Sequence, residues 1–211
     1  MLFKYFLSPC LSPITSLIDK ESPPQEVKIK QKGESFISGW KINLSVCDDV
    51  LAEIHRLFDT SSNYDKVRGY HRITSGVMDE DVKKKYLQQV DYCFSQYREK
   101  FVWIDHSGDW FRTEPFNLQR FDPLNAYSPR HLEDGGPVKG KLMRKLTWCT
   151  YLNTIKNGGE TEWQYQKVTY QPVKGDTIIF PACWTHPHWG LPAITETKYI
   201  ATGWASYKHR A

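Results

Sequence analysis

The sequence of 211 residues contains no apolar run of about 18 or more residues, which is the length that a transmembrane helix requires. It also has no clean secretory leader, because Ser8, Pro9 and Pro13 interrupt its apolar start and no small-residue cleavage site follows. Its five cysteines are odd in number and form no Cys-x-x-Cys pair, which favours free thiols in a reducing compartment over a disulfide framework. We therefore expect no membrane partner and a cytoplasmic location, or the host cytoplasm if the protein is viral.

Neither sign of charge dominates. The chain has 28 basic and 24 acidic residues, and a net charge of +4 is too small and too dispersed to predict nucleic acid binding. The sequence also lacks internal repeats and low-complexity blocks. Its length fits one domain, which we expect over residues 36–211 after a partly ordered lead-in at 1–35. The sequence leaves the oligomeric state open.

The first half of the chain carries apolar residues at helical spacing. Over residues 45–59 this spacing predicts an amphipathic helix with Ser45 as its N-cap. Over residues 79–104 it predicts the longest helix, whose acidic start suits the helix dipole. Residues 45–104 are therefore expected to give helical support to a second, strand-rich half.

After about residue 115 the pattern changes to alternation with period two. Segments 144–153 and 196–207 each predict a strand, and 167–182 predicts two strands around a Pro-Val-Lys-Gly-Asp turn. A further short strand begins at residue 160, after an Asn-Gly-Gly turn. Short strands with no helical pattern between them predict a mainly β fold, as an antiparallel sandwich or open barrel buttressed by the N-terminal helices.

His131 and Glu133 form a His-x-carboxylate pair whose side chains point the same way in an extended segment. A second imidazole from a distant strand would complete two histidines and one carboxylate, an arrangement that suits non-haem Fe(II) oxygen chemistry. His186 and His188 are both candidates, and strand alternation does not separate them. The pair alone is a weak signal, because a solvated loop ending in Glu-Asp-Gly-Gly explains it equally well.

One face of the strand at 196–207 carries four side chains of mixed chemistry: Lys198, Ile200, Thr202 and Trp204. A lysine on the inner face of a barrel needs an anionic partner, since an unpaired buried charge is very costly. A ligand carboxylate is a natural partner, and Thr202 and Tyr151 would add hydroxyl donors to it. The alternative is a lysine that reaches the barrel rim, with Tyr151 as plain core.

Together these segments resemble the Fe(II)/2-oxoglutarate-dependent dioxygenases, specifically the prolyl 4-hydroxylase-like group. The resemblance covers about 115–207 and rests on HLE (131–133), RKLTWCTYLN (144–153), GGETEW (158–163), PVKGDTIIFPA (172–182), HWGLP (188–192), and Lys198 followed by TGW (202–204). It implies a double-stranded β-helix, or jelly-roll, core over these residues. It also implies Fe(II), 2-oxoglutarate and O2 as cofactor and cosubstrates, and it allows for ascorbate.

The resemblance assigns a role to each matching position. For the metal the matching residues are His131, Glu133 and His188. For 2-oxoglutarate they are Lys198, which would pair with the far carboxylate, its hydrogen-bonding helpers Tyr151 and Thr202, the aromatic wall Trp204, and Arg144 near the pocket. Strand parity puts Arg144 on the face opposite Tyr151, so its role requires a bulge.

Two positions depart from the group's pattern. Glu133 stands where most members have Asp, and in this respect the chain is similar to phage and marine bacterial sequences. Phe121, ten residues before His131, stands where several members have Tyr, so one hydroxyl is missing at the metal end of the pocket.

The spacing to the lysine decides between the two distant histidines. His188 lies ten residues before Lys198, as the pattern of the group requires, and His186 lies twelve before it. A shift of two residues along a strand would move the metal by about 6 to 7 Å. We therefore expect His188 to hold the metal and His186 to lie near the barrel rim, either against a metal ligand or facing the substrate.

The resemblance implies a hydroxylase that acts on a peptidyl proline, with succinate and CO2 as co-products. Two alternatives stay open: the same chemistry on a non-peptide molecule such as a free amino acid, a sugar or a nucleobase, or a catalytically inactive jelly-roll binding module. Residues 60–78 and 105–114 are expected to cap the mouth of the barrel and to select the substrate.

Overall fold

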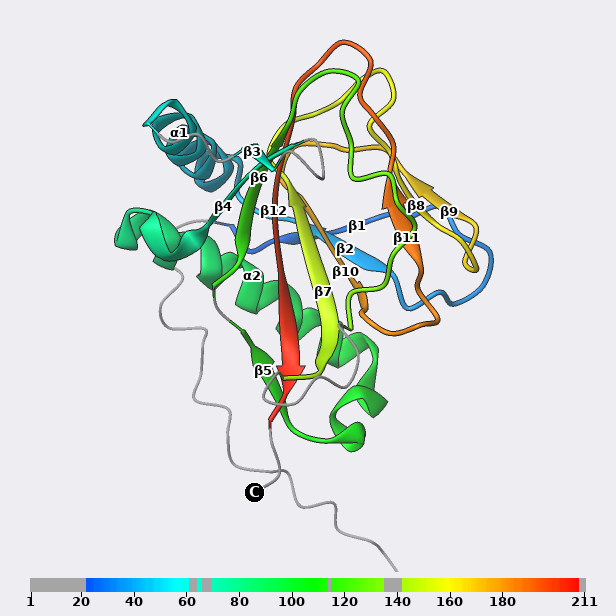
Figure 1. The fold of residues 1–211 in the computed structure, drawn as a ribbon. Coiled ribbons are helices and arrows are strands. Elements are labelled where there is room, and N and C mark those ends of the chain that lie inside the picture. Colours follow the sequence, from blue (N-terminus) through cyan, green and yellow to red (C-terminus); the bar gives the residue numbers. More distant parts are fainter. Residues whose placement is uncertain (1–21, 61–63, 66–69, 114, 135–141, 209–211) are drawn as a thin grey trace, which may run out of the picture.

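A computed structural model describes residues 22–60, 64–65, 70–113, 115–134 and 142–208. The fold is mainly β, with two antiparallel sheets and a minor helical part among these residues. Figure 1 shows the larger sheet running through the molecule, the two long helices behind it, and the smaller sheet to one side. No helix in the described part of the chain is long and apolar enough to cross a membrane.

The larger sheet has nine strands among the described residues, and all its pairings are antiparallel. In spatial order eight of them are β1 (Gln25–Val27), β2 (Ser38–Lys41), β10 (Asp176–Pro181), β7 (Arg144–Tyr151), β12 (Lys198–Tyr207), β6 (Asn117–Phe121), β4 (Tyr70–Thr74) and β3 (Tyr64–Asp65). The ninth, β5 (Trp110–Arg112), pairs with the end of β12. The four strands expected over 144–153, 167–182 and 196–207 are therefore confirmed: β7 in the first segment, β9 and β10 in the second, and β12 in the third.

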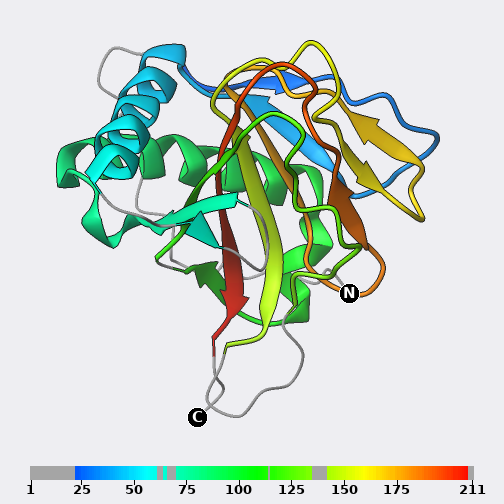
Figure 2. The ribbon, with the colours of Figure 1, turned by 45° about the horizontal axis from the view of Figure 1, so that its top comes forward.

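The smaller sheet has three antiparallel strands in the order β11 (His188–Gly190), β8 (Thr161–Trp163) and β9 (Val168–Tyr170). Figure 2 shows this sheet facing one side of the larger sheet while both helices cover the other side. The strand expected after the Asn-Gly-Gly turn is β8. Two faces of the large sheet thus have different partners, and a space between the sheets is available for a site.

The helices begin and end where local chemistry dictates. In α1 (Leu44–Thr60) the Asn43 side chain accepts a hydrogen bond from the Ser45 amide at 2.9 Å, so the expected Ser45 cap is wrong and Asn43 takes that role. In α2 (Glu80–Lys100) Asp79 caps the amides of Asp81 and Val82. This helix is shorter than predicted, because the chain leaves the helical region at Phe101 (φ −119°, ψ 68°). The short 3₁₀ helices η2 (Ser75–Val77) and η3 (Val102–Ser107) complete the described helical elements.

Two hydrophobic cores lie on opposite faces of the large sheet, because side chains alternate along each strand. Toward the helices, Leu146 and Trp148 of β7 pack with side chains of α1 and α2. Between the sheets, Tyr151 packs with residues of β8, β9 and β10, including Trp163 and Phe180. The helices therefore stabilise the outer face, and the inner face is left for chemistry.

Gly203 shows how tightly the helix-facing core is packed. A Cβ at this position would lie 2.3 Å from the ring of Trp148 and 2.8 Å from Phe116. No side chain fits there without moving an indole that is fully buried. Glycine at 203 lets β12 approach the helices while Thr202 and Trp204 face the other way.

The β region is larger than the expected core at 115–207. Strands β1 and β2 come from residues 25–41, where β1 pairs with β2 and β2 pairs with β10, and β4 comes from the segment expected to be helical support. Of the segment 105–114, which was expected to cap a barrel mouth, residues 110–112 form β5 and pair with Ala205–Tyr207, at the end of β12 far from Lys198. The lead-in prediction for 1–35 falls partly outside the described residues, since the description begins at residue 22. Four cysteines are free, as expected: Cys47, Cys93, Cys149 and Cys183.

Candidate metal centre and adjoining cavity

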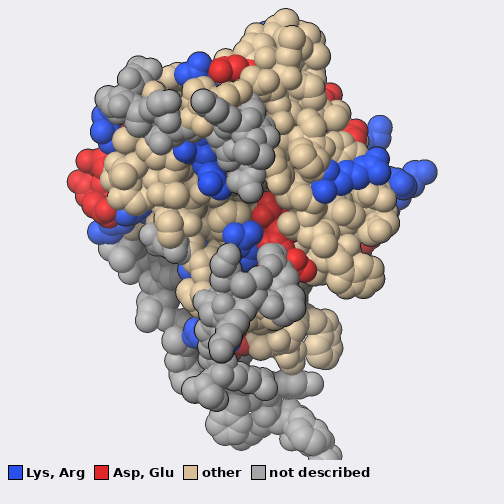
Figure 3. Space-filling view, viewed as in Figure 1, with Lys and Arg blue, Asp and Glu red and all other residues tan. Residues whose placement is uncertain are grey.

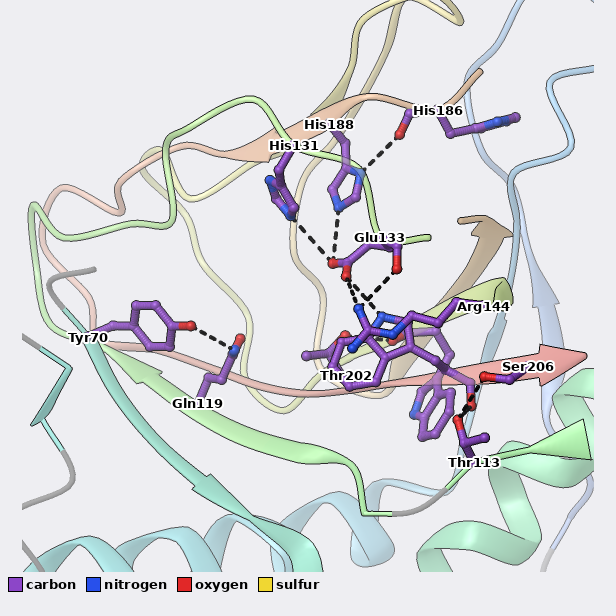
Figure 4. Close-up of polar contacts among 12 residues, drawn as sticks. Tyr70, Thr113, Gln119, His131, Glu133, Arg144, His186, His188, Thr202 and Ser206 are labelled. Atoms are coloured by element: carbon purple, nitrogen blue, oxygen red, sulfur yellow. Dashed lines mark hydrogen bonds and ion pairs between the residues drawn. The ribbon is translucent and has the colours of Figure 1, made fainter. Parts of the chain in front are cut away.

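Three potential metal ligands meet between the two sheets (Figure 4). His131 and His188 lie opposite each other in an isolated antiparallel bridge, in which each backbone amide donates to the other residue's carbonyl at 3.1 Å. The Glu133 amide donates to the carbonyl of Ala182, just after β10. Backbone pairing alone therefore brings together residues that lie more than fifty positions apart in the sequence.

The ligand atoms form a compact group. Oε1 of Glu133 lies 3.4 Å from Nε2 of His131 and 3.7 Å from Nε2 of His188. One donor atom from each residue lies within 4.8 Å of the other two. Two imidazoles and one carboxylate, arranged to leave other coordination positions open, suit Fe(II). The residues present thus fit the metal that the sequence pattern implies.

Backbone carbonyls orient both imidazoles. Nδ1 of His131 lies 2.9 Å from the carbonyl oxygen of Pro129, and Nδ1 of His188 lies 3.1 Å from that of His186. A carbonyl oxygen only accepts, so each Nδ1 carries a proton, and Nε2 is the ring nitrogen that faces the space between the ligands. Fixing the tautomer in this way is a common feature of histidine ligands.

The second carboxylate oxygen of Glu133 is held on the other side. Nε1 of Trp204 donates to Oε2 at 2.9 Å, and an Nη1 of Arg144 lies 3.4 Å from the same atom. Burial by itself raises the pKa of Glu133, but hydrogen bonds and charge from His131 and His188 outweigh it and hold that pKa well below its ordinary value. The carboxylate is therefore an anion, the form that binds a cation.

A β-bulge brings Arg144 to this site, as strand alternation required for a side chain that would otherwise lie on the opposite face. In the pairing of β7 with β12, Ala205 faces Leu146 but Ser206 faces Arg144, so Lys145 is an extra residue on β7. The bulge turns Arg144 to the inner face, where its guanidinium carbon lies 3.5 Å from the centre of the Trp204 ring. Lys145 points the opposite way and donates to backbone carbonyls of Ile104 and Gly108.

Lys198 is buried, with 6% of its surface exposed, and it faces the same space. Its Nζ donates to the carbonyl of Gly159 at 2.7 Å, and no carboxylate in the described part of the chain lies within ion-pair distance. Gly159 lies in the turn before β8 with φ +76°, a backbone conformation that glycine adopts without strain. Burial lowers the pKa of Lys198 from 10.5 to about 8. A buried ammonium without an anion is a site for an anionic ligand.

Tyr151 and Thr202 also line the cavity, but their hydroxyls have partners. Tyr151 donates to the hydroxyl of Thr161 at 2.8 Å, which leaves the Thr161 proton free to point elsewhere. Thr202 donates to the carbonyl of Trp148 at 2.9 Å. The Thr202 hydroxyl proton is thus bound to a backbone carbonyl. Thr161 belongs to the GGETEW segment of the resemblance but was given no role there, and the structure places it beside Tyr151.

His186 lies away from the three ligands. Its ring is buried, Nε2 bonds to the carbonyl oxygen of Ser35 at 2.9 Å, and Nδ1 lies 2.8 Å from the Thr185 hydroxyl. In Figure 4 the ring points away from Glu133. The expectation of a rim position facing substrate is wrong, because the imidazole anchors the segment before β2. Only the backbone carbonyl of His186 touches a proposed ligand, through Nδ1 of His188.

A cavity of about 310 Å³ adjoins the ligands, which is a size suited to a small ligand. Its wall toward β6 and β4 includes Phe121, which the sequence placed at the metal end of the pocket. Asn117 and Gln119 were not singled out, although alternation along β6 puts all three on one face. The side-chain amide of Gln119 donates to the Tyr70 hydroxyl at 3.4 Å. The side-chain amide of Asn117 has no hydrogen-bond partner among the described residues. Phe121 stacks on Tyr70 at 4.7 Å. Part of the segment 60–78 thus lines the cavity, as Tyr70 and Arg72, and the rest lies partly outside the described residues.

The surface around the site has no continuous basic area among the described residues. On the face shown in Figure 3, Lys and Arg atoms lie in scattered groups and mix with Asp and Glu atoms near the centre. The cationic side chains that a ligand in the cavity would meet are those of its lining, namely Lys198, Arg72 and Arg144.

Comparisons with known proteins agree with this geometry. Residues 116–206 match the family model of the 2OG-Fe(II) oxygenase superfamily. A viral collagen prolyl hydroxylase from Paramecium bursaria chlorella virus 1, solved with 2-oxoglutarate, is 20% identical, with a TM-score of 0.64 over 84% of this chain and 98% of that one. A Pseudomonas putida prolyl 4-hydroxylase is 19% identical, with a TM-score of 0.60 over 83% and 94%.

A third similar structure is a prolyl hydroxylase from Trichoplax adhaerens, in complex with a peptide fragment of the hypoxia-inducible factor oxygen degradation domain. It is 20% identical, with a TM-score of 0.55 over 82% of this chain and 84% of that one. A search of curated proteins found no match. At these identities the structural likeness establishes the fold.

Proposed function

We propose that this chain, whose residues 116–206 belong to the 2OG-Fe(II) oxygenase superfamily, hydroxylates a peptidyl proline with Fe(II), 2-oxoglutarate and O2. The observation that carries the proposal is the pairing of two features in one cavity. A cluster of two histidines and one carboxylate faces a buried lysine that has no anion among the described residues. One feature suits the metal and the other suits the cosubstrate.

Each residue has a defined task in this reaction. Fe(II) and 2-oxoglutarate supply the oxidative chemistry, with O2 consumed and succinate and CO2 released. His131, Glu133 and His188 hold the metal, and Lys198 pairs with a carboxylate of the cosubstrate while Tyr151 and Thr161 fix its hydrogen bonds. Phe180 and Trp163 pack beside His188 and exclude water from that side.

The wall of the cavity formed by β6 and β4 supports a peptide as the substrate. Asn117 and Gln119 offer both donors and acceptors, and Arg72 adds a cation near the same space. Proline-rich peptides adopt an extended helix whose backbone carbonyls have no internal partners, so they need such groups when they are desolvated. The similar solved structures named above are prolyl hydroxylases, and one of them holds a peptide.

Two finer features belong to the same proposal. The two facing antiparallel sheets support a double-stranded β-helix, or jelly-roll, core. The four free cysteines support a reducing compartment such as the cytoplasm. Ascorbate, which would keep the iron reduced, is a proposed addition to the assay.

The decisive assay measures succinate release from 2-oxoglutarate with Fe(II) and O2. We expect a proline-rich peptide to raise succinate release several-fold, and a matched peptide with alanine in place of proline to leave it at the uncoupled level. Mass spectrometry should find one added oxygen on proline. If free amino acids, sugars or nucleobases stimulate release and peptides do not, the substrate is a small molecule. If nothing binds iron or 2-oxoglutarate, the protein is a binding module.

The pKa of Lys198 predicts how 2-oxoglutarate affinity depends on pH. In the ligand-free protein Lys198 is protonated below about pH 8 and neutral above it, because burial lowers its pKa. Only the protonated form attracts a carboxylate. The KM for 2-oxoglutarate should therefore be constant from about pH 6.5 to 7.5 and then rise, approaching about tenfold per pH unit above 8.

Steady-state kinetics from pH 6.5 to 9.5 measures this rise. Lys198→Arg is the control, because a guanidinium stays protonated throughout this range. If it binds 2-oxoglutarate at all, its KM should not rise with pH. A wild-type KM that stays flat to pH 9.5 would show that Lys198 is not the group that binds the anion.

A further inference from the structure

Glu133 has one methylene more than the aspartate that most related sequences carry, and the structure shows what the longer side chain contacts. We propose that Trp204 and Arg144 form a clamp on Oε2 of Glu133 that places Oε1 for the metal. The clamp rests on the proposed metal site but not on the identity of the substrate. Trp204 and Arg144 are positioning residues in this role, because they reach the metal only through Glu133.

The two oxygens of the carboxylate have separate partners. Oε1 faces the imidazoles of His131 and His188, at 3.4 and 3.7 Å. Oε2 accepts the indole hydrogen bond of Trp204 at 2.9 Å on the opposite side. With Oε2 held in this way, rotation of the carboxylate about its last bond is restricted, and Oε1 stays directed between the rings.

Arg144 fixes the indole as well as the carboxylate. Its guanidinium carbon lies 3.5 Å from the centre of the Trp204 ring, and its Nη1 donates to the backbone carbonyl of Glu133 at 2.9 Å. The Lys145 bulge is what brings this side chain to the inner face. The arginine therefore ties the backbone of Glu133, its side chain and the tryptophan into one unit, and a regular strand would not provide this contact.

The clamp is specific for glutamate because of reach. Aspartate on the same backbone would draw the carboxylate back by one carbon–carbon bond, about 1.5 Å. A hydrogen bond at 2.9 Å on one side and contacts of 3.4 and 3.7 Å on the other cannot all survive a retreat of that size. The extra methylene of Glu133 lets its carboxylate reach the Trp204 indole, and the indole restricts the added freedom of the longer side chain.

Metal titration without 2-oxoglutarate tests the clamp separately from turnover. The probe is Co(II), whose visible absorption reports its coordination geometry, added to the full chain. We expect Trp204→Phe to weaken Co(II) binding by about 10- to 100-fold and to change the spectrum, because loss of the partner of a metal ligand has effects of this size. Circular dichroism and thermal melting confirm that the variant is folded.

Two comparisons make the test specific. In a Glu133→Asp background, Trp204→Phe should weaken Co(II) binding by less than about threefold further, since the shorter side chain no longer reaches the indole. The matched control is Trp110→Phe, because the Trp110 indole also donates to a carboxylate, that of Asp105 at 2.7 Å, and has an arginine over its ring, but it does not line the cavity. It should keep Co(II) affinity within about threefold.

The clamp is overturned if Trp204→Phe keeps wild-type affinity, if it loses the same factor in both backgrounds, or if Trp110→Phe loses as much. If Trp204→Phe does not fold, Arg144→Lys carries the test. It keeps the charge but loses the planar stack, and we expect weaker Co(II) binding with an altered spectrum. Unchanged binding in Arg144→Lys would also overturn the clamp. A protein that binds Co(II) with the clamp intact but hydroxylates no peptide would refute the proposed substrate and leave the clamp standing.

Discussion

The His188→Ala protein is expected to lose Fe(II) binding and turnover, whereas the His186→Ala protein is expected to keep the metal. His188 presents Nε2 to Oε1 of Glu133, and His186 presents its ring to the carbonyl of Ser35. Removing a ligand from a three-residue site leaves too few donors for Fe(II). Anaerobic titration with Fe(II), followed by the succinate assay, measures both effects.

The two histidines are also expected to differ in their contribution to stability, with His186 important for the fold and not for the metal. His186→Ala removes a buried hydrogen bond that ties the β10–β11 loop to the segment before β2, so it should lower stability by about 1 to 3 kcal/mol. His188 keeps its own carbonyl partner in that variant, since the partner is the backbone of residue 186. A His186→Ala protein that melts normally but has lost iron would contradict both the register argument and the observed geometry.

Lys198→Met should raise the KM for 2-oxoglutarate by about 100-fold or more and leave Fe(II) affinity nearly unchanged. The substitution removes the buried cation while keeping an unbranched chain of similar length, and a lost charge–charge contact in a dry site has an effect of this order. Initial rates at varied 2-oxoglutarate, together with Fe(II) titration, separate the two quantities. Loss of iron with unchanged cosubstrate affinity would refute the assignment.

Lys145→Met is the matched control for this change. Lys145 is buried as well, and burial lowers its pKa to about 8, but it points to the opposite face of β7. Its substitution should leave the KM for 2-oxoglutarate within about twofold, because its contacts lie outside the cavity that holds Lys198. A large rise in both variants would mean that buried charge in general, and not the position of Lys198, controls affinity.

Lys198 should also cost stability in the absence of ligand. A folded pKa near 8 against 10.5 corresponds to a penalty of about 3 kcal/mol. The sign follows from proton binding: the penalty is complete below pH 8 and disappears between 8 and 10.5, where the unfolded chain binds more protons. Burial of Lys198 therefore lowers the stability of the ligand-free protein, and an anionic ligand that pairs with the ammonium would restore it.

Local patterns predicted the parts of the site that depend on short spacing. The pair His131 and Glu133 lies two residues apart, and the shared face of Lys198 and Thr202 follows from strand alternation alone. Both were brought to one cavity as expected. The choice of His188 rested on its spacing to Lys198, and the structure places it with the other two ligands.

Features set by distant partners could not be predicted in this way. The carbonyl that binds His186 lies 151 positions earlier in the chain, and nothing near Ser35 marks it. The strands before α1 could not be recognised from their own composition, because pairing makes them strands: β2 pairs with β10, and β1 pairs with β2. Strand alternation showed that a bulge was needed to bring Arg144 to the inner face. Its position at Lys145 could not be predicted, because it depends on the register between β7 and β12.

The position of β12 has a consequence for biosynthesis. Of the described strands it is the last to leave the ribosome, yet in the finished sheet it lies between β7 and β6. Until it emerges, both of those strands have open edges that invite pairing with other chains. Lys198 belongs to this strand, so the nascent chain lacks the proposed partner of 2-oxoglutarate until almost all of the described residues have been made. Long-range pairing of this kind is slow, and we expect the newly made chain to depend on chaperones during that interval.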